Sequence, residues 1–576
     1  MRMEAQMKAA FWMENAYFDE QTRQEVRNLP LEEIEERFYT DLEFGTGGLR
    51  GKMGAGTNRM NRYVVRKITQ GLADVLCRQG ERAMRQGVVI AFDSRLRSAE
   101  FARETALVLA KNGIRVYLFA SLRPTPELSF AIRYYHAAAG VNITASHNPK
   151  EYNGYKVYGA DGGQLTPEKA EEIAEQIQQR TEWQIGRMTE AEARQSGRLL
   201  ELGRETDELY FQALLVQMLY PELVREQGNR LRIVYTPLHG AGIMAIPAVL
   251  RGAGFTDLHI VSAQSMPDGA FPTVQLPNPE SPEAFRWALA EAETRKADLV
   301  LASDPDADRL GAYVRDKTGD YVRLNGNQIG VLLLYYLLSQ RKKQGNLPPD
   351  GKVVTSIAST ELGGEIARAF GVERILVPVG FKYIGEQIRR METEKKGTFL
   401  FGYEESFGYL AGTHARDKDA VQAALLLAEA ALYYKTMENR TLPRVLEEIY
   451  RQFGWYDDRQ FSVVREGRKG KIEINAMMQC LRSGAFQQLG GVPIAAVEDY
   501  ADSVCTDLRD GSSRPLSLPK SNALRYLLCG GGFVLARPSG TEPKMKFYIS
   551  VRGTSCARIE EQICGIQEDI RRIIGL

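Results

Sequence analysis

The feature that most constrains the fold is a strand-helix-strand rhythm that recurs along the chain. Its first instance runs from Gly87 to Phe119, with Ser98 as the candidate N-cap of the helix, and further instances begin at Leu231 and near Gln328. Such units build mostly parallel sheets whose ligands bind at the carboxyl ends of the strands. We therefore expect α/β domains with functional loops at strand ends.

Length and composition bound the number of domains and the class of protein. A chain of 576 residues is too long for one core, so three or four domains of ~100–200 residues are expected. Hydrophobic residues make up 44% and charged residues 26%, as in ordinary globular proteins. The formal net charge of +1 provides no general field for nucleic acid or an anionic membrane, so any attraction for a charged ligand must be local.

The cysteines and the apolar runs indicate where the protein works. The 6 cysteines form no CxxC pair, which favours a reducing compartment. The N-terminus lacks the apolar core of a signal peptide, and the apolar run Val331 to Leu338 is far shorter than the ~20 residues that span a bilayer. We expect a cytoplasmic monomer or small homo-oligomer with no membrane or nucleic-acid partner.

The stretch Ile143 to Pro149 is the first candidate site. An apolar run before it indicates a short buried strand, and the proline prevents that strand from continuing. A serine at such a corner, here Ser146, is exposed and rigidly aimed, as a covalent nucleophile or phosphate carrier must be. Taken alone, the stretch is more typical of a turn that hydrogen-bonds its own backbone.

Three other loops have the composition of a phosphate or sugar site. The glycine-dense segment Glu43 to Gly51 includes an arginine suited to phosphate, although a mobile hairpin would have a similar sequence. The segment Gly402 to Gly408 closes a buried strand with a glutamate and a serine. The segment Arg537 to Lys544 combines an arginine, two hydroxyls and a glycine turn, which are donors for phosphate oxygens.

Three alternate aspartates, Asp304, Asp306 and Asp308, indicate a divalent cation, because uncompensated carboxylates so close together repel one another. Oxygen ligands select Mg²⁺, Mn²⁺ or Ca²⁺ over zinc. An EF-hand is excluded, since Arg309 and Arg315 stand where its glycine and glutamate are required. A phosphatase with an aspartate nucleophile would leave the third aspartate and the serine loop without roles.

This set of loops, in this order, resembles the α-D-phosphohexomutase family from about Gly45 to Lys544, and the loop Gly402 to Gly408 is most similar to the family's bacterial phosphoglucomutase branch. The resemblance implies an α/β fold of three similar α/β domains with mixed sheets and a fourth α+β phosphate-clamp domain, heart-shaped around a central cleft. The predicted domains, with their functional loops, are domain I with the phosphoserine loop (1–205), domain II with the metal-binding loop (206–322), domain III with the sugar-binding loop (323–450) and domain IV with the phosphate-binding loop (451–576).

The resemblance also implies a reaction. It is the interconversion of α-D-glucose 1-phosphate and glucose 6-phosphate by an isomerase of carbohydrate metabolism, an intramolecular phosphotransferase. A phosphoserine would transfer its phosphoryl group through a glucose 1,6-bisphosphate intermediate, which also serves as activator, with Mg²⁺ as cofactor.

The residues that the resemblance implies fall into three groups. The catalytic residues are Arg50, Ser146, Lys156 and, as a weaker acid-base candidate, His147; the substrate contacts are Arg309, Glu404, Ser406, Lys418, Arg537, Ser539, Gly540 and Thr541; the metal ligands are Asp304, Asp306, Asp308 and the phosphorylated Ser146. Without the resemblance, Lys156 follows a tight turn at 151–156 and would be a solvated surface residue.

Several features leave alternatives open. Glucose-specific relatives tend to have threonine where Val379 precedes Gly380, so a phosphopentomutase or phosphomannomutase on the same fold is an alternative. A phosphoglucosamine mutase and a non-catalytic sugar-phosphate sensor are others. His239 is a lone histidine beside glycines, more often structural than functional. Residues 168–230 are expected to be a charged helical bridge, and 507–519 a mobile loop.

Overall fold

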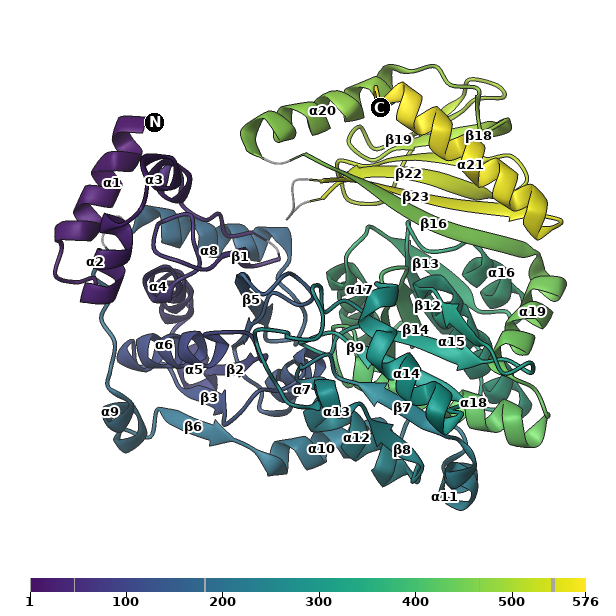
Figure 1. Cartoon of the computed structure of the whole chain (residues 1–576), viewed down its shortest axis with the longest axis horizontal. Coiled ribbons are helices and arrows are strands. Elements are labelled where there is room, and N and C mark those ends of the chain that lie inside the picture. The colour runs from purple at the N-terminus through teal and green to yellow at the C-terminus, as the bar shows by residue number, and fades with distance from the viewer. Residues whose placement is uncertain (1, 46, 181–182, 466, 540–543) are drawn as a thin grey trace. The chain divides into compact units, whose positions relative to one another are not determined.

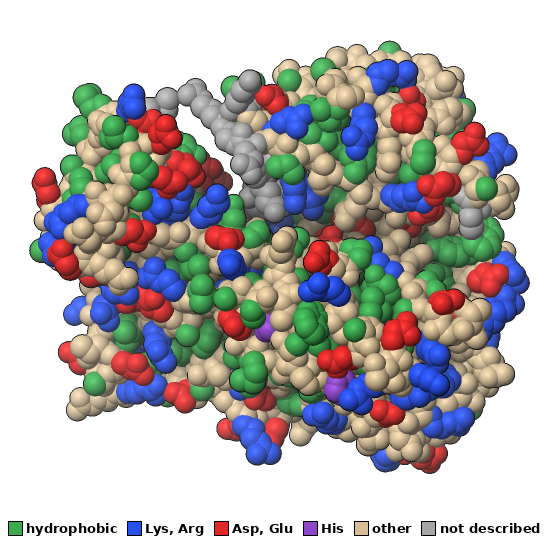
Figure 2. Space-filling view, viewed as in Figure 1, with side chains coloured by type: hydrophobic (Ala, Val, Ile, Leu, Met, Phe, Trp, Pro, Cys, Tyr) green, Lys and Arg blue, Asp and Glu red, His purple; other side chains and the backbone are tan. Residues whose placement is uncertain are grey.

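The computed structural model describes residues 2–45, 47–180, 183–465, 467–539 and 544–576 (Figure 1). The chain forms two compact units. The first contains Met1–Leu324, Ile384–Lys395 and Phe407–Glu438, and the second contains Asn325–Tyr383, Lys396–Ser406 and Asn439–Leu576. Among the described helices, none combines the length and the apolar character needed to cross a membrane. Acidic and basic side chains are interspersed over the face seen in Figure 2, as a net charge of +1 would suggest.

The N-terminal helices form a small aromatic cluster around Trp12. The Trp12 ring stacks on Phe18 at 4.3 Å between centroids and meets Phe38 and Tyr63 edge-on. Asp19 caps the second helix by accepting a hydrogen bond from the Thr22 amide at 2.8 Å. The elements that contribute are α1 (Arg2–Glu14), α2 (Glu20–Arg27), α3 (Leu31–Phe38) and α4 (Arg62–Arg78).

The first sheet is mixed and has the order β1-β5-β4-β2-β3-β6. Alternate residues of β2 face opposite sides: Val88 and Ile90 pack with α4, α6 and α8, whereas Val89 and Ala91 pack with α7. The elements are β1 (Leu49–Lys52), α5 (Glu81–Gln86), β2 (Val88–Phe92), α6 (Ser98–Lys111), β3 (Val116–Phe119), α7 (Thr125–Tyr134), β4 (Ala139–Ile143), β5 (Tyr152–Gly159), α8 (Pro167–Gln179), α9 (Glu190–Gln195) and β6 (Leu199–Leu202).

The connections of this sheet create a topological switch point. From β2 the chain crosses to β3 on one side and then returns to β4 on the other, and all three strands are parallel. Loops that leave neighbouring strands in opposite directions open a crevice at the carboxyl edge. The loop that carries Ser146 leaves β4 at this edge, beside the loop that leaves β2.

The second sheet, β11-β10-β9-β7-β8, repeats this plan. Its parallel strands β7, β8 and β9 place the loop after β7 beside the loop after β9, which carries the three aspartates. The elements are α10 (Arg204–Leu215), α11 (Pro221–Gln227), η1 (Gly228–Arg230), β7 (Ile233–Thr236), α12 (Gly242–Ala253), β8 (Leu258–Ile260), α13 (Ser262–Ser265), η2 (Pro282–Phe285), α14 (Arg286–Arg295), β9 (Leu299–Ser303), β10 (Leu310–Arg315) and β11 (Tyr321–Leu324). The first unit also contains β15 (Gly408–Ala411), which is not a strand of this sheet, and α18 (Ala420–Met437).

In the second unit, the parallel strands β13-β12-β14 follow the same order of connections, and Glu404 ends the returning strand. The sugar loop therefore occupies the position in this domain that the serine and aspartate loops occupy in theirs. The elements are α15 (Gly326–Lys343), β12 (Gly351–Ser356), α16 (Leu362–Ala369), β13 (Glu373–Val377), α17 (Phe381–Glu394), β14 (Thr398–Glu404) and α19 (Leu442–Phe453), of which α17 passes into the first unit after Tyr383.

The C-terminal domain is an antiparallel sheet, β16-β23-β22-β21-β18-β19-β20, with β17 beside β18. Helices α20 and α21 cover one face (Figure 1). The elements are β16 (Trp455–Val464), α20 (Gly467–Ser483), β17 (Gln488–Leu489), β18 (Val492–Asp499), β19 (Val504–Asp507), β20 (Ser513–Pro515), β21 (Leu524–Leu528), β22 (Gly532–Pro538), β23 (Lys544–Gly553) and α21 (Cys556–Ile573). The predicted fold class, three α/β domains with mixed sheets and a fourth α+β domain, is confirmed.

Four local predictions were wrong. Residues 168–230 contain a strand, β6, whose Leu199 and Leu202 are buried. The expected turn at 151–156 belongs to β5, because β1 and β4 both pair with it. The segment 507–519, expected to be a mobile loop, contributes β20 to the fourth sheet. Ser98 is the first residue of α6 and not its N-cap, and its hydroxyl donates to Asp93 at 2.8 Å.

Candidate active site

Ser146 stands in a left-handed backbone conformation with φ of 52°. Its amide donates to Thr144 Oγ1 at 2.7 Å, and its Oγ donates to Asp304 Oδ2 at 2.7 Å and lies 3.1 Å from His147 Nδ1. The side chain is rigidly aimed, as predicted. The predicted exposure was wrong, because the residue is only 3% exposed and the aspartate loop lies against it.

The aspartate loop is folded by its own backbone. The amides of Asp308 and Arg309 both donate to Asp304 Oδ1 at 3.1 Å, and Ala307 takes a φ of 50°. Gly240, in the loop after β7, allows this arrangement, because a Cβ there would lie 2.4 Å from Pro305 Cα. Carboxylate oxygens of Asp304, Asp306 and Asp308 lie within 4.8 Å of one another.

The electrostatics of this cluster fit a divalent cation. Burial, together with the two neighbouring carboxylates, raises the pKa of Asp304 well above its usual value, and burial and Asp306 also raise the pKa of Asp308. Burial acts in the same direction on Asp306, but the ion pair with Lys156, the hydrogen bond with Asp304 and the charge of Lys418 together outweigh it, and the pKa of Asp306 is lowered. The Oδ1 atoms of Asp306 and Asp308 are buried and accept no hydrogen bond from any described residue. Such oxygens suit Mg²⁺, Mn²⁺ or Ca²⁺.

Two lysines contact the aspartates. Lys156, on β5, places Nζ 3.0 Å from Asp306 Oδ2 and 4.0 Å from Asp308 Oδ2. Lys418, just before α18, places Nζ 3.0 Å from Asp308 Oδ2 and 3.0 Å from Asp417 Oδ1. Lys156 is only 7% exposed, so the interpretation of it as a solvated residue is wrong.

Arg50 and Arg309 also lie at this site. Arg50 donates to the Asn148 side chain at 2.5 Å, next to the serine loop. Arg309 pairs with Glu280 at 2.5 Å and lies 3.8 Å from Asp308. The first unit thus brings together the predicted residues Arg50, Ser146, His147, Lys156, Asp304, Asp306, Asp308, Arg309 and Lys418.

The remaining predicted contacts belong to the second unit. Glu404 Oε1 accepts a hydrogen bond from the Gly380 amide at 2.7 Å, so the backbone after Val379 orients this carboxylate. Its neighbour Glu405 is buried and accepts from Ser356 at 2.9 Å. Ser406 follows at the end of the same loop and is partly exposed.

Arg537 lies on β22, and the amide of Ser539, just after this strand, donates to the Lys544 carbonyl on β23 at 2.8 Å. Burial raises the pKa of Glu405, and the positive charges of Lys546 and Arg537 oppose this effect. Two predicted phosphate contacts, Gly540 and Thr541, lie outside the described residues.

Some residues of the site were missed by sequence reasoning. Asp417 fixes Lys418 and is itself held by Tyr158 at 3.0 Å and Gln164 at 2.8 Å. Arg95, after β2, contacts the serine loop. The signal that would have found it is an Asp-x-Arg sequence directly after a buried strand. His239 is structural, since its ring nitrogens lie 3.0 Å from the Met266 carbonyl and 2.9 Å from Thr273 Oγ1.

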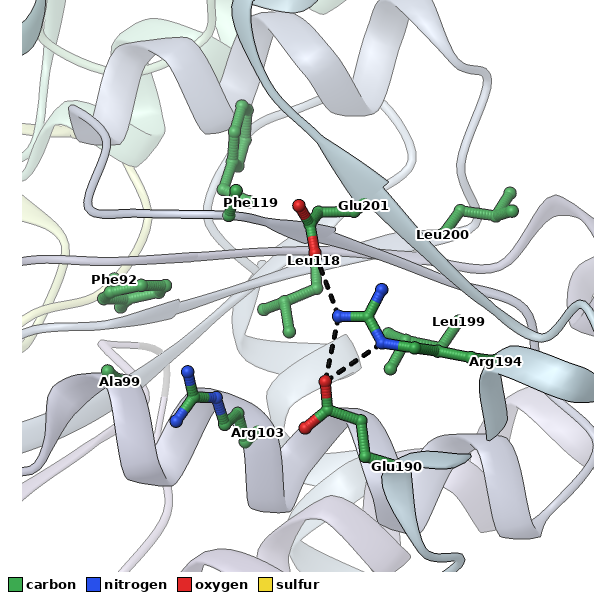
Figure 3. A pocket seen from close by; sticks show the side chains of 11 residues that line it. Phe92, Ala99, Arg103, Leu118, Phe119, Glu190, Arg194, Leu199, Leu200 and Glu201 are labelled. Carbon is green, nitrogen blue, oxygen red and sulfur yellow. Dashed lines mark hydrogen bonds and ion pairs between the residues drawn. The ribbon is translucent and has the colours of Figure 1, made fainter. Parts of the chain in front are cut away.

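A separate pocket in the first unit contains none of these residues. It lies between α6, α9 and the strands β3 and β6 (Figure 3). Arg194 in its wall is paired with Glu190 and Glu201, each at 2.9 Å, and with Arg103, which also lines the pocket, the wall carries no net charge. The pocket therefore does not compete with the serine and aspartate loops as the candidate active site.

Comparisons with known proteins agree with this geometry. Models of the phosphoglucomutase/phosphomannomutase α/β/α domains I, II and III match residues 41–184, 208–319 and 325–453. The chain is 39% identical over 537 residues to a phosphoglucomutase of Staphylococcus haemolyticus, covering 92% of this chain and 94% of the relative. It is 37% identical over 560 residues to one of Staphylococcus aureus strain USA300, covering 95% and 96%.

Solved structures share the fold. A putative phosphomannomutase from Thermus thermophilus superposes with a TM-score of 0.68 at 23% identity, covering 93% of this chain and 100% of that one. The parafusin phosphoglucomutase of Paramecium, in an open form, superposes with a TM-score of 0.65 at 16% identity, covering 93% and 97%. At these identities the likeness supports the arrangement of the chain and does not identify a substrate.

Proposed function

Because the chain belongs to the phosphoglucomutase/phosphomannomutase family, we propose that it interconverts α-D-glucose 1-phosphate and glucose 6-phosphate through a phosphoserine and a glucose 1,6-bisphosphate intermediate. The protein is an enzyme, an isomerase that acts as an intramolecular phosphotransferase. The observation that carries the proposal is the contact of the Ser146 hydroxyl with the buried aspartate cluster.

In the proposed reaction, Ser146 Oγ carries a phosphoryl group. A free hydroxyl of the bound sugar monophosphate forms a new bond to phosphorus as the bond to Ser146 Oγ breaks, and the bisphosphate then returns its other phosphoryl group to the serine. The hydroxyl proton is exchanged with Lys156, and His147, 3.1 Å from Ser146 Oγ, is the second acid-base candidate. Bound Mg²⁺, held by Asp304, Asp306 and Asp308, would withdraw charge from the phosphoryl oxygens.

The positive side chains of the site have distinct proposed roles. Arg50 and Arg309 share the charge of the phosphoryl group in transfer, and Lys418 meets a substrate phosphate. Asp417 supports this assignment of Lys418, because it and Asp308 each lie 3.0 Å from the ammonium and fix its position in the site.

We assign sugar recognition to Glu404 and Ser406, which would bind ring hydroxyls. The residues that would hold the phosphate that does not react are Arg537, Ser539, Gly540 and Thr541. The hydrogen bond from the Gly380 amide keeps Glu404 in place without a side chain from residue 379, which supports glucose recognition despite the valine there. A phosphopentomutase or phosphomannomutase remains the alternative on this fold, and a non-catalytic sugar-phosphate sensor is less well supported.

We propose that the enzyme works in the cytoplasm as a monomer or small homo-oligomer whose partner is a phosphorylated sugar and not nucleic acid or a membrane. The described cysteines Cys77, Cys480, Cys505, Cys529 and Cys564 are free thiols, which supports a reducing compartment. The domain boundaries at 205/206, 322/323 and 450/451 stay predictions.

The test is glucose 6-phosphate production from glucose 1-phosphate with Mg²⁺ and a trace of glucose 1,6-bisphosphate. Wild type is compared with Ser146→Ala and with the control Ser265→Ala, a serine on α13. We expect turnover by wild type and control, loss in Ser146→Ala, and phosphate on Ser146 by peptide mass spectrometry. If the enzyme converts ribose 1-phosphate or mannose 1-phosphate but not glucose 1-phosphate, it is a phosphopentomutase or a phosphomannomutase. A folded wild type with no turnover and no phosphate would favour the sensor.

A further inference from the structure

Arg95 binds the backbone of the serine loop. It lies in the segment between β2 and α6, is only 2% exposed, and donates hydrogen bonds to carbonyl oxygens on both sides of the loop's turn. The acceptors are the carbonyls of Ser146 at 2.5 Å, Pro149 at 2.8 Å, Tyr152 at 3.0 Å and, at close range, Asn148. One planar guanidinium therefore ties together the segment that presents the candidate nucleophile.

The guanidinium is itself held from two directions. Its Nε lies 3.4 Å from Asp93 Oδ2, while Asp93 Oδ1 accepts hydrogen bonds from the Arg95 amide at 2.9 Å and from Ser98 at 2.8 Å. The ring of Phe271 covers the guanidinium, with its centroid 5.1 Å from Arg95 Cζ. Arg95 can therefore neither turn away from the serine loop nor exchange its partners for water.

The cover over Arg95 comes from the second sheet's domain. Gly269 forms an isolated bridge with Arg95, and a Cβ at Gly269 would lie 2.3 Å from the Leu96 amide nitrogen, so a larger residue would push the two segments apart. His239 stabilises the segment that contains Gly269 and Phe271, because its ring contacts Met266 and Thr273 on either side of them in the sequence. The same domain thus supplies both Asp304, which contacts Ser146, and the residues that cover Arg95.

The backbone conformation of Ser146 explains why such a clamp is needed. A φ of 52° is unfavourable for a residue with a Cβ, so contacts from outside the turn are needed beside its local hydrogen bonds to Thr144 and Ala145. Lysine has the same charge but cannot replace arginine at position 95. Arginine has five N–H donors in a rigid plane, whereas lysine has three on a single nitrogen. A lysine at position 95 could not satisfy four carbonyls that spread over residues 146–152.

We propose that Arg95 is a positioning residue for phosphoryl transfer, which fixes the peptide after Ser146 and so aims Oγ at the aspartate cluster. The inference rests on the proposed function of Ser146. Arg95 contacts neither the candidate sugar contacts nor the candidate phosphate contacts among the described residues. Its loss should therefore slow the transfer step and leave the affinity for sugar phosphate unchanged.

The experiment compares Arg95→Lys with Arg66→Lys in the full-length enzyme. Arg66 is a matched control, because it is 7% exposed, lies in the same domain and forms a two-point ion pair with Glu104 at 2.7 and 3.0 Å, but does not contact the serine loop. We expect kcat for glucose 1-phosphate to fall about 10- to 100-fold in Arg95→Lys, since small misplacements of reacting groups have effects of this size. The KM of Arg95→Lys should stay within about twofold of the wild-type value. Arg66→Lys should keep the wild-type kcat even though it loses about as much thermal stability as Arg95→Lys.

A second variant, for the case that Arg95→Lys does not fold, keeps Arg95 and shortens the side chain that lies over its guanidinium. Phe271→Leu should lower kcat by a smaller factor, again with KM unchanged. Retention of wild-type kcat by Arg95→Lys, or an equal loss in Arg66→Lys, would overturn the proposal. Phosphate on Ser146 is measured in every preparation. If active wild-type enzyme carries no phosphate there, the proposed phosphoserine is refuted. If Ser146 is phosphorylated and Arg95→Lys has the wild-type kcat, only the role of Arg95 is refuted.

Discussion

Asp458, on β16 of the C-terminal domain, should make the stability of the protein depend on pH. Burial raises the pKa of this carboxyl from an ordinary 3.8 to about 7, against the opposing effect of the Ser550 and Thr360 hydroxyls, and the charges of Asp457 and Glu361 raise it further. The Oδ1 atom of Asp458 is buried and accepts no hydrogen bond from the described residues. The folded protein therefore favours the protonated carboxyl.

The sign of the effect follows from proton binding. Between about pH 4 and pH 7 the folded state keeps a proton that the unfolded chain releases, so the free energy of unfolding falls as pH rises and levels off above the folded pKa. A window of about three pKa units at about 1.4 kcal/mol each gives at most about 4 kcal/mol. Structural relaxation around the carboxylate reduces this, so we expect about 2–4 kcal/mol.

Asp458→Asn removes the titration while keeping the shape of the side chain. Its unfolding midpoint in urea, relative to wild type, should rise between pH 5 and pH 8. Asp499→Asn is the matched control, since Asp499 lies on β18 of the same domain, is ion-paired with Arg482 at 3.0 Å and is not among the charges that shift the pKa of Asp458. The reasoning would be refuted if the unfolding midpoint of Asp458→Asn, relative to wild type, stayed constant or fell as pH rises.

Three further substitutions probe other parts of the structure. In Gly240→Ala the new methyl would collide with Pro305, so we expect Mg²⁺ titrations of activity to require at least about tenfold more Mg²⁺, and an unchanged titration would contradict this. Arg525→Ala leaves the partly buried Glu361 with only one of its two ion pairs, and urea unfolding should show a loss of about 1.5–3 kcal/mol. Trp12→Ala empties the centre of the N-terminal cluster and should lower stability by about 3–5 kcal/mol in the same assay, whereas a loss below about 1 kcal/mol would show that this cluster unfolds independently.

The sequence alone was sufficient to locate the loops of the site. Ser146 and Asp304 each follow an apolar strand, and Glu404 ends one. Three α/β domains with the same order of connections place these loops at equivalent switch points. Their position depends on periodicity and on breakers such as Pro149, which are local properties of the chain. The α/β domains could be predicted for the same reason, whereas the α+β fourth domain was implied by the family resemblance.

Contacts between distant segments could not be predicted in this way. Lys156 looks like a surface residue until β1 and β4 pair with both edges of its strand and bury it beside Asp306. Arg95 is separated from Ser146 by 51 positions, and nothing near it in the sequence indicates which carbonyls it binds. Strand β6 was hidden because only Leu199 and Leu202 of its residues are buried, which is too few for a clear alternation.

Three of the candidate functional loops contain a residue in a strained backbone conformation, as do several other loops of the described chain. Ser146, Ala307 and Phe407 all have positive φ, at 52°, 50° and 64°, although none is a glycine. A loop selected for stability alone would place glycine or asparagine there, since each strained residue costs about 1–3 kcal/mol. These conformations persist because distant groups hold them: Arg95 binds the Ser146 carbonyl, and the carbonyls of Ala307 and Phe407 accept from the amides of Ala420 and Leu310. A loop whose shape is imposed from outside is detectable in the sequence as a loop, but its geometry belongs to the assembled domains.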